Sequence, residues 1–184
     1  IRHVSALDID YANELGYRIK LLGIARQTER GIEQRVHPCM VPVGSPIAAT
    51  DGVFNAVVVD GDFVDKVVMV GRGAGAGPTA SAVVADLIDI ARGHRTPTFA
   101  IPASELRPAE VSPIAQRRGR YYVRLMVVDR PGVIADVAAS LRDEQVSMEA
   151  FLQRGRAPGE AVQVVLTTHE TDEDSMQRAL ATIG

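Results

Sequence analysis

A run of prolines between Gly93 and Gly119 constrains the fold of this chain more than any other feature. Four prolines fall in this stretch, namely Pro97, Pro102, Pro108 and Pro113. Each one removes a backbone donor and disfavours helix at the preceding residue, and no apolar period persists through the segment. We therefore predict two folded parts, residues 1–93 and 120–184, joined by a linker over 94–119 that is partly ordered along a domain surface.

The composition is that of an ordinary globular protein, with 46% hydrophobic and 23% charged residues among 184. The net charge of −3 gives no reason to expect nucleic acid or an anionic membrane as a partner. No apolar run approaches the roughly 20 residues of a membrane span. The single Cys39 excludes an internal disulfide and favours a reducing compartment, so we expect a cytoplasmic protein.

The first part carries the signals of an α+β fold built on a mixed or antiparallel sheet. Ser5 and Asp8 have the spacing that opens a helix, and Gly16 stands where a left-handed residue would end it. Between two Val-rich segments, Asp60-Gly61 predicts a tight hairpin turn. The predicted strands are Tyr17–Ala25, Ile32–Met40 (interrupted by Pro38), Val53–Val59 and Phe63–Val70, and a helix is predicted from Pro78 to Arg92.

A glycine-rich loop, Gly71 to Gly77, lies between the last of these strands and the helix. Glycines allow backbone N–H groups to approach a ligand closely, and a helix N-terminus favours an anion such as phosphate. The loop does not open a complete dinucleotide-binding unit, because the proline-rich stretch follows the helix where a second parallel strand is required. Spacing alone leaves two interpretations open, a cofactor loop and a loop needed only for strand-to-helix packing.

The last part predicts the order β-α-β-β-α, a ferredoxin-like unit that a closing strand would complete. The sequence ends at Gly184 before such a strand, so we expect it to lie outside these residues or to be trimmed. The predicted strands are Tyr121–Val128, Val146–Gln153 and Ala161–Thr168; the predicted helices are Val133–Glu144 and, capped by Thr171, Asp172–Ile183.

The turn Asp129-Arg130-Pro131-Gly132 precedes the helix that begins at Val133. Proline fixes φ and glycine frees it, so the turn has a purely structural interpretation. The functional alternative is that a small effector places its carboxylate at the helix N-terminus. His37 has no second ligand at metal spacing, so no metal site is expected, and Cys39 is expected to be a small strand residue.

Several motifs of the first part resemble the homoserine dehydrogenase family. They are Glu14–Leu22 (ELGYRIKLL), Arg35–Pro38 (RVHP), Gly52–Val57 (GVFNAV), Gly71–Gly75 (GRGAG) and Pro78–Asp86 (PTASAVVAD). Asp65 stands where that family often has Gly. The second part resembles an ACT domain, with its turn at Asp129–Val133. Together, the two resemblances cover nearly the whole chain.

The resemblance implies an NAD(P)-dependent oxidoreductase that interconverts L-homoserine and L-aspartate 4-semialdehyde in amino-acid biosynthesis. Gly75 is then expected to contact the cofactor, with Gly73, Ala74 and Thr79 shaping the loop. Asp129, Gly132 and Val133 are expected to bind an effector, most simply threonine. The resemblance also implies a homodimer or homotetramer.

The resemblance places the catalytic lysine and its acidic partners upstream of Ile1, so this chain alone is expected to be inactive. Lys20 belongs to the family's Ile-Lys-Leu-Leu strand, so a structural or ion-pair role is expected for it. Two alternatives stay open. One is a non-catalytic amino-acid-binding or assembly module whose glycine loop is structural, and the other is an enzyme with another substrate on the same fold.

Overall fold

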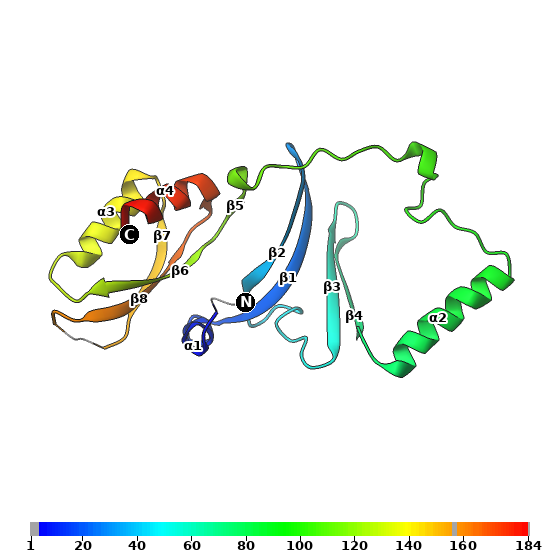
Figure 1. Cartoon of the computed structure of the whole chain (residues 1–184), viewed down its shortest axis with the longest axis horizontal. Coiled ribbons are helices and arrows are strands. Elements are labelled where there is room, and N and C mark those ends of the chain that lie inside the picture. Colours follow the sequence, from blue (N-terminus) through cyan, green and yellow to red (C-terminus); the bar gives the residue numbers. More distant parts are fainter. Residues whose placement is uncertain (1–3, 156–157, 184) are drawn as a thin grey trace. The chain divides into compact units, whose positions relative to one another are not determined.

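The computed structural model describes residues 4–155 and 158–183 and separates into two compact units. Unit 1 contains Ile1–Glu14, Leu21–Pro38 and Glu110–Gly184, and unit 2 contains Leu15–Lys20 and Cys39–Ala109. Figure 1 shows the elements of both units, which are described separately here.

Helix α1 (Ala6–Glu14) begins where the sequence predicts. The Asp8 carboxylate accepts hydrogen bonds from the Ser5 backbone N–H and hydroxyl, both at 2.7 Å, and these contacts satisfy donors at the start of the helix. Tyr11 and Ala12 are fully buried, although the helix is short and has little intrinsic amphipathic character. The chain leaves the helix through Gly16, whose φ of 80° is readily accessible to glycine.

Strands β1 (Tyr17–Thr28) and β2 (Gly31–Pro42) form a two-stranded sheet across a turn at residues 29–30. Both strands are longer than predicted. Pro38 is accommodated because each strand of a two-stranded sheet has one edge that needs no ladder donor. Gly31 has a φ of 107°, and a Cβ placed on it would lie 2.4 Å from the carbonyl oxygen of Glu110 in the same unit.

Strands β3 (Phe54–Gly61) and β4 (Asp65–Arg72) form an antiparallel pair in which Gly61 lies opposite Asp65. The predicted turn at Asp60-Gly61 is therefore wrong, since both residues belong to β3 and the connection consists of residues 62–64. A three-residue connection requires a left-handed residue at its end. Asp65 supplies it with a φ of 53°, a conformation that Asp tolerates better than most residues with a Cβ.

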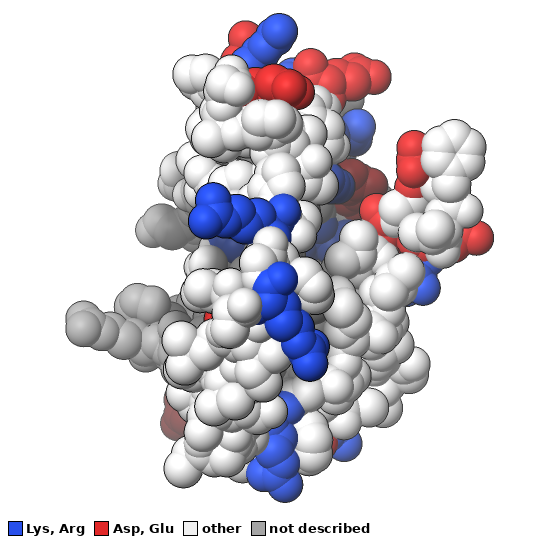
Figure 2. Space-filling view, turned by 90° about the vertical axis from the view of Figure 1, so that its right-hand side faces the viewer, with Lys and Arg blue, Asp and Glu red and all other residues white. Residues whose placement is uncertain are grey.

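Helix α2 (Ala76–Ala91) begins two residues before the predicted Pro78 and has no buried residue. Its apolar side chains are Val83, Val84, Leu87, Ile88 and Ile90, each more than two-fifths exposed. Figure 2 shows the side of the molecule on which α2 lies in Figure 1, with wide areas free of charged residues. An amphipathic helix gains most of its stability by burying such a face, so this surface is suited to contact with further protein.

The proline-bearing stretch after α2 contains short ordered elements. It contains the 3₁₀ turns η1 (Ala103–Glu105) and η2 (Ile114–Gln116) and strand β5 (Arg118–Gly119). Strand β5 pairs with β9 (Thr171–Asp172), and an isolated bridge joins Val111 to Ile32 of β2. The end of the stretch is thus held to unit 1 by backbone hydrogen bonds.

The C-terminal residues of unit 1 have the predicted order β-α-β-β-α. The strands form an antiparallel sheet in the order β6-β8-β7, and a core of Val137, Leu141, Val146, Leu166, Met176 and Ala179 lies between this sheet and its helices. These elements are β6 (Tyr122–Val128), α3 (Val133–Asp143), β7 (Met148–Gln153), β8 (Ala161–Thr168) and α4 (Glu173–Ile183).

The α+β class and the ferredoxin-like arrangement are confirmed, with three strands of that sheet in the described residues. Helix α4 begins at Glu173, one residue later than predicted, because Thr171 and Asp172 form strand β9. Among the helices of the described residues, none is long and apolar enough to cross a membrane.

Candidate functional site

The glycine loop reaches the N-terminus of α2 with its backbone exposed. Gly75 precedes the helix with a φ of 131° and provides no side-chain cap. The Thr79 N–H donates to the Gly75 carbonyl at 3.0 Å, which is the first hydrogen bond of the helix. The N–H groups of Ala76 and Gly77 precede that bond and therefore have no intrahelical acceptor. This arrangement offers backbone donors to an anionic group.

Asn55 of β3 lies directly against Gly73. A Cβ on Gly73 would stand 2.0 Å from the Asn55 amide nitrogen, whereas Gly71 and Gly77 have open space around them. Gly73 therefore leaves room for the Asn55 side chain, and Gly71 and Gly77 leave the loop accessible. Because β3 and β4 are antiparallel and no strand of the described residues follows α2 in parallel, the loop does not open a dinucleotide-binding βαβ unit, as the sequence indicated.

The second predicted site lies at the turn that joins β6 to α3. Gly132 precedes the helix with a φ of 93° and, like Gly75, offers no side-chain cap, while Val133 is half-buried. The Asp129 N–H donates to the Glu160 carbonyl at 2.8 Å, and the Gly159 N–H donates back to Asp129 at 2.9 Å. The turn is thus held against the loop that precedes β8, and the Val133 N–H at the start of α3 donates to the Arg130 carbonyl at 3.3 Å.

A buried carboxylate that the sequence analysis had assigned only to a helix cap joins α1 to strand β6. Asp8 is 4% exposed. Its second oxygen accepts hydrogen bonds from the Tyr122 hydroxyl and from Nε of Arg124, both at 2.8 Å. Burial raises the pKa of Asp8, but the hydrogen bonds from Ser5, Tyr122 and Arg124 outweigh it and lower the pKa to about 2.

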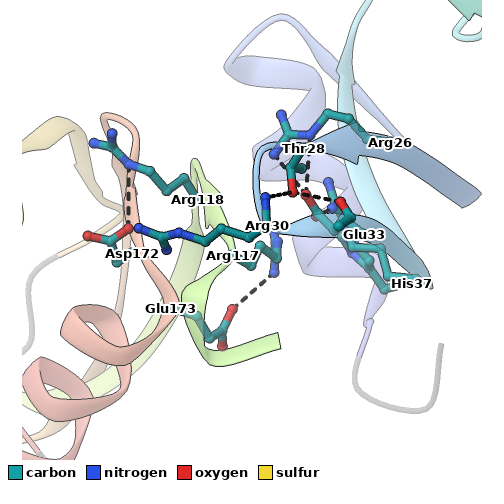
Figure 3. Close-up of polar contacts among 11 residues, drawn as sticks. Arg26, Thr28, Arg30, Glu33, His37, Arg117, Arg118, Asp172 and Glu173 are labelled. Atoms are coloured by element: carbon teal, nitrogen blue, oxygen red, sulfur yellow. Dashed lines mark hydrogen bonds and ion pairs between the residues drawn. The ribbon is translucent and has the colours of Figure 1, made fainter. Parts of the chain in front are cut away.

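A second polar network surrounds Glu173 at the start of α4 (Figure 3). Glu173 accepts hydrogen bonds from Arg117 at 3.1 Å and from the Tyr121 hydroxyl at 2.7 Å. Burial raises the pKa of Glu173, but hydrogen bonds from Gln177, Tyr121 and Arg117 lower it below its usual value overall. Burial, followed by the bond to Glu173, raises the pKa of Tyr121.

The same view shows the carboxylate of Glu33, which is buried in β2. Arg26 donates to it at 2.8 Å, and Arg35 forms an ion pair with it. In the β1–β2 turn, the Thr28 hydroxyl donates to the Gly31 carbonyl at 2.7 Å. These contacts stabilise the β1–β2 hairpin locally.

The remaining sequence candidates take structural positions. Lys20 donates to the Thr50 carbonyl and to Asp51, both at 2.7 Å, and this contact lowers the pKa of Asp51. Nε2 of His37 accepts from Arg35 at 2.9 Å, while Nδ1 lies 2.9 Å from the Pro38 carbonyl. Cys39 is partly buried in β2. Within residues 4–155 and 158–183 no group of three potential ligands could hold a metal ion.

The described geometry places the two predicted sites in different units. Gly73, Ala74, Gly75 and Thr79 lie together in unit 2, and Asp129, Gly132 and Val133 lie together in unit 1. The sequence alone predicts no role for Asn55, although this residue lies within one of the family-like motifs, and none for Tyr122 or Arg124. Side-chain alternation along β6 places Tyr122 and Arg124 on one face of the sheet. Asp8, to which both donate, lies far away in the sequence.

Comparison with known proteins agrees with this architecture. The second part has a three-stranded antiparallel sheet with the order β-α-β-β-α, and residues 121–184 match the family model for the ACT domain. ACT domains are modules that bind amino-acid effectors. Residues 1–88 match the family model described as homoserine dehydrogenase. The chain belongs to the homoserine dehydrogenase family, as the motifs indicated.

Individual relatives align along the full length of the chain. The homoserine dehydrogenase of Neisseria gonorrhoeae is 44% identical over 189 residues, and that of Pseudomonas aeruginosa is 40% identical over 190. The crystal structure of a homoserine dehydrogenase from Thiobacillus denitrificans superposes with a TM-score of 0.88 at 44% identity. All of this chain is covered in each case, but it spans only 43%, 44% and 42% of those three proteins.

Proposed function

We propose that this chain works as the C-terminal part of an NAD(P)-dependent homoserine dehydrogenase that interconverts L-homoserine and L-aspartate 4-semialdehyde. The observation that carries the proposal is the alignment of the entire chain with homoserine dehydrogenases at up to 44% identity. Residues 1–93 belong to the catalytic region in this proposal, 94–119 form the linker and 120–184 form the ACT domain. A cytoplasmic location is part of the proposal, since the single Cys39 suits a reducing compartment.

The glycine loop is the part of the chain that meets the cofactor in this proposal. Ala76 and Gly77 offer backbone N–H groups to a phosphate, and Gly73 and Gly75 allow the close approach that a bulkier residue would prevent. Ala74 and Thr79 complete the loop. A bound NAD(P) supplies the hydride acceptor or donor of the reaction. The residues of this chain contribute binding and orientation, and we place the catalytic lysine outside it.

The exposed apolar surfaces of unit 2 support a larger assembly. In the β3–β4 pair, Val57 lies opposite Met69 and Val59 opposite Val67, and all four side chains are at least two-fifths exposed. We propose that this face, called here the Val57–Met69 face, forms a homodimer contact. The apolar side of α2 then packs against the remaining part of the enzyme.

The ACT domain is the sensor in this proposal, and its effector is threonine. Asp129, Gly132 and Val133 form the turn at which the effector's carboxylate would meet the first N–H groups of α3. Threonine acts as a regulator only if it binds two states of the enzyme with different affinity.

The test uses the longer protein of which this chain is, in this proposal, the C-terminal part. We expect purified protein to reduce NAD⁺ or NADP⁺ in the presence of L-homoserine and to be inhibited by L-threonine. Deletion of the residues equivalent to 120–184 should leave measurable turnover but abolish the inhibition. Absence of homoserine-dependent turnover from a folded protein would contradict the catalytic assignment and favour a non-catalytic amino-acid-binding module.

A further inference from the structure

The sheet of the ACT domain has two faces, and the core helices account for only one of them. Val123 and Leu125 of β6 pack against the core formed with α3 and α4. Because side chains alternate along a strand, Tyr122 and Arg124 lie on the opposite face. Their directly paired residues on β8 are Thr167 and Val165, which therefore share that face.

This opposite face is also buried. Val165 is fully buried and Thr167 is 9% exposed, although neither belongs to the core beneath α3 and α4. Helix α1 contributes two fully buried residues, Tyr11 and Ala12. Since Asp8 of this helix bonds to Tyr122 and Arg124, α1 lies over the second face of the sheet.

Both edge strands of the sheet hold α1 in place. At the β6 edge, Asp8 accepts hydrogen bonds from Tyr122 and Arg124. Beyond the β7 edge, Nε of Arg154 donates to Glu14 at 3.1 Å, and its guanidinium lies 4.3 Å from the centre of the Tyr11 ring. The Asp8 contact is buried and the Glu14 contact is half exposed, so the first is the stronger anchor.

The chain connects the contact between α1 and β6 to the ACT turn on one side and to unit 2 on the other. Strand β6 carries Tyr122 and Arg124 and ends at Val128, immediately before the Asp129–Val133 turn. At about 3.3 Å per residue, Arg124 lies roughly 17 Å along the strand from that turn. At its other end, α1 continues through Gly16 into Tyr17 and Lys20, which belong to unit 2. A displacement of β6 therefore reaches α1 through a rigid strand and a buried ionic contact.

We propose that α1 transmits effector binding from the ACT domain to the catalytic region, with the Asp8–Tyr122–Arg124 contact as the coupling point. The inference rests on the proposed function, because it requires an effector at the ACT turn. It assigns to Asp8 a role beyond the cap of α1, since Oδ2 accepts from Ser5 within the cap whereas Oδ1 accepts from Tyr122 and Arg124. In this proposal the contact has two states, one with the hydrogen bonds to Asp8 formed and one with them broken. The effector binds one of these states more tightly than the other.

Hydrogen exchange of the 184-residue chain, with L-threonine as the probe and L-lysine as the control ligand, tests the proposal. Saturating threonine should slow exchange of the backbone amides of residues 10–14 by about fivefold or more, the lower end of typical allosteric coupling. The Tyr122→Phe variant should bind threonine within about threefold of the parent but lose this change. For each variant, the ratio of the α1 exchange rates with and without threonine is compared. This ratio distinguishes a loss of coupling from a general destabilisation of α1.

Two further variants sharpen the test. Asp8→Asn should behave like Tyr122→Phe. Arg120→Gln, which breaks the exposed Arg120–Glu149 pair, should keep the full response of α1. Threonine binding that leaves α1 exchange unchanged in the parent, or a response that survives in both Tyr122→Phe and Asp8→Asn, would overturn the coupling role alone. Failure of the parent to bind threonine would overturn the effector assignment and the coupling with it.

Discussion

The Tyr122 hydroxyl donates a 2.8 Å hydrogen bond to the buried carboxylate of Asp8, a residue 114 positions earlier in the chain. The bond joins a helix from the homoserine dehydrogenase portion to a strand of the ACT domain within one compact unit. The ACT sheet is therefore covered on both faces, by α3 and α4 on one and by α1 on the other.

Replacing Tyr122 with Phe should measurably destabilise the chain. The substitution removes one donor to a buried carboxylate, and a hydrogen bond to a charged group contributes about 1.5–3 kcal/mol. Urea unfolding followed by circular dichroism should show a corresponding decrease in the free energy of unfolding. Tyr17→Phe is the matched control, because no hydrogen bond of the Tyr17 hydroxyl is present in the described residues. Equal stabilities of the two variants would contradict the importance of the Asp8 contact.

Asp8 should make the protein sensitive to acid. Its folded-state pKa of about 2 lies below the unfolded value near 3.8, so the stabilisation is present above pH 4 and is lost as the pH falls towards 2. Over this range the parent should lose roughly 2 kcal/mol more than Asp8→Asn, at about 1.4 kcal/mol for each unit of pKa difference. Urea titrations at several pH values would measure the difference, and Asp10→Asn controls for net charge. Parallel curves for the parent and Asp8→Asn would refute this role.

Gly31→Ala should disrupt the attachment of the proline-bearing stretch to β2. The new Cβ would collide with the Glu110 backbone, and a φ of 107° is unfavourable for alanine, so we expect a loss of about 2 kcal/mol or more. Hydrogen exchange at the amides of Ile32 and Ser112 should quicken, since both bond across this contact.

Substitutions of two other glycines distinguish the steric collision at Gly31 from the strain of its positive φ. Gly16→Ala tests a positive φ with open space around the Cβ, and Gly44→Ala tests open space where no positive φ is involved. We expect the loss in the free energy of unfolding to be largest for Gly31→Ala, smaller for Gly16→Ala and smallest for Gly44→Ala. A Gly31→Ala variant no less stable than Gly16→Ala would show that the Glu110 backbone moves aside at little cost.

The Val57–Met69 face should control self-association. Met69→Glu places a charge among the three remaining exposed apolar side chains of the face and should weaken the homodimer at least tenfold, which is about 1.4 kcal/mol. Sedimentation velocity over a range of concentrations measures the effect. Lys66→Glu, on the opposite face of the same hairpin, controls for the added carboxylate. Similar sedimentation of both variants would exclude this face as the contact.

Local patterns in the sequence predicted most of the secondary structure. Ser5 and Asp8 marked the start of α1 correctly because a helix cap depends on neighbouring residues only. The turn predicted at Asp60-Gly61 was wrong because Val-rich residues on both sides favour a strand equally and do not show where the strand ends. The left-handed conformation expected at a glycine is found at Asp65 instead. Propensity does not distinguish a two-residue from a three-residue connection when both sides are Val-rich.

The contacts that shape unit 1 could not be predicted in the same way. Asp8 was expected to act only within α1, and nothing in its neighbourhood indicates Tyr122 or Arg124 as partners. Alternation along β6 places both on one face of a strand, but the element that covers this face is fixed by tertiary packing. Likewise, Asn55 meets Gly73 because β3 and β4 pair in one register, which the sequence alone does not determine.

Calorimetric titration of the 184-residue chain with L-threonine, with L-serine and L-lysine as controls, tests whether the ACT domain binds threonine. We predict saturable binding that is selective for threonine and is weakened about tenfold or more in Gly132→Ala, where a φ of 93° strains any residue with a Cβ. A folded chain that binds none of the three amino acids, or binds them equally, would contradict the proposed role of the ACT domain as a threonine sensor.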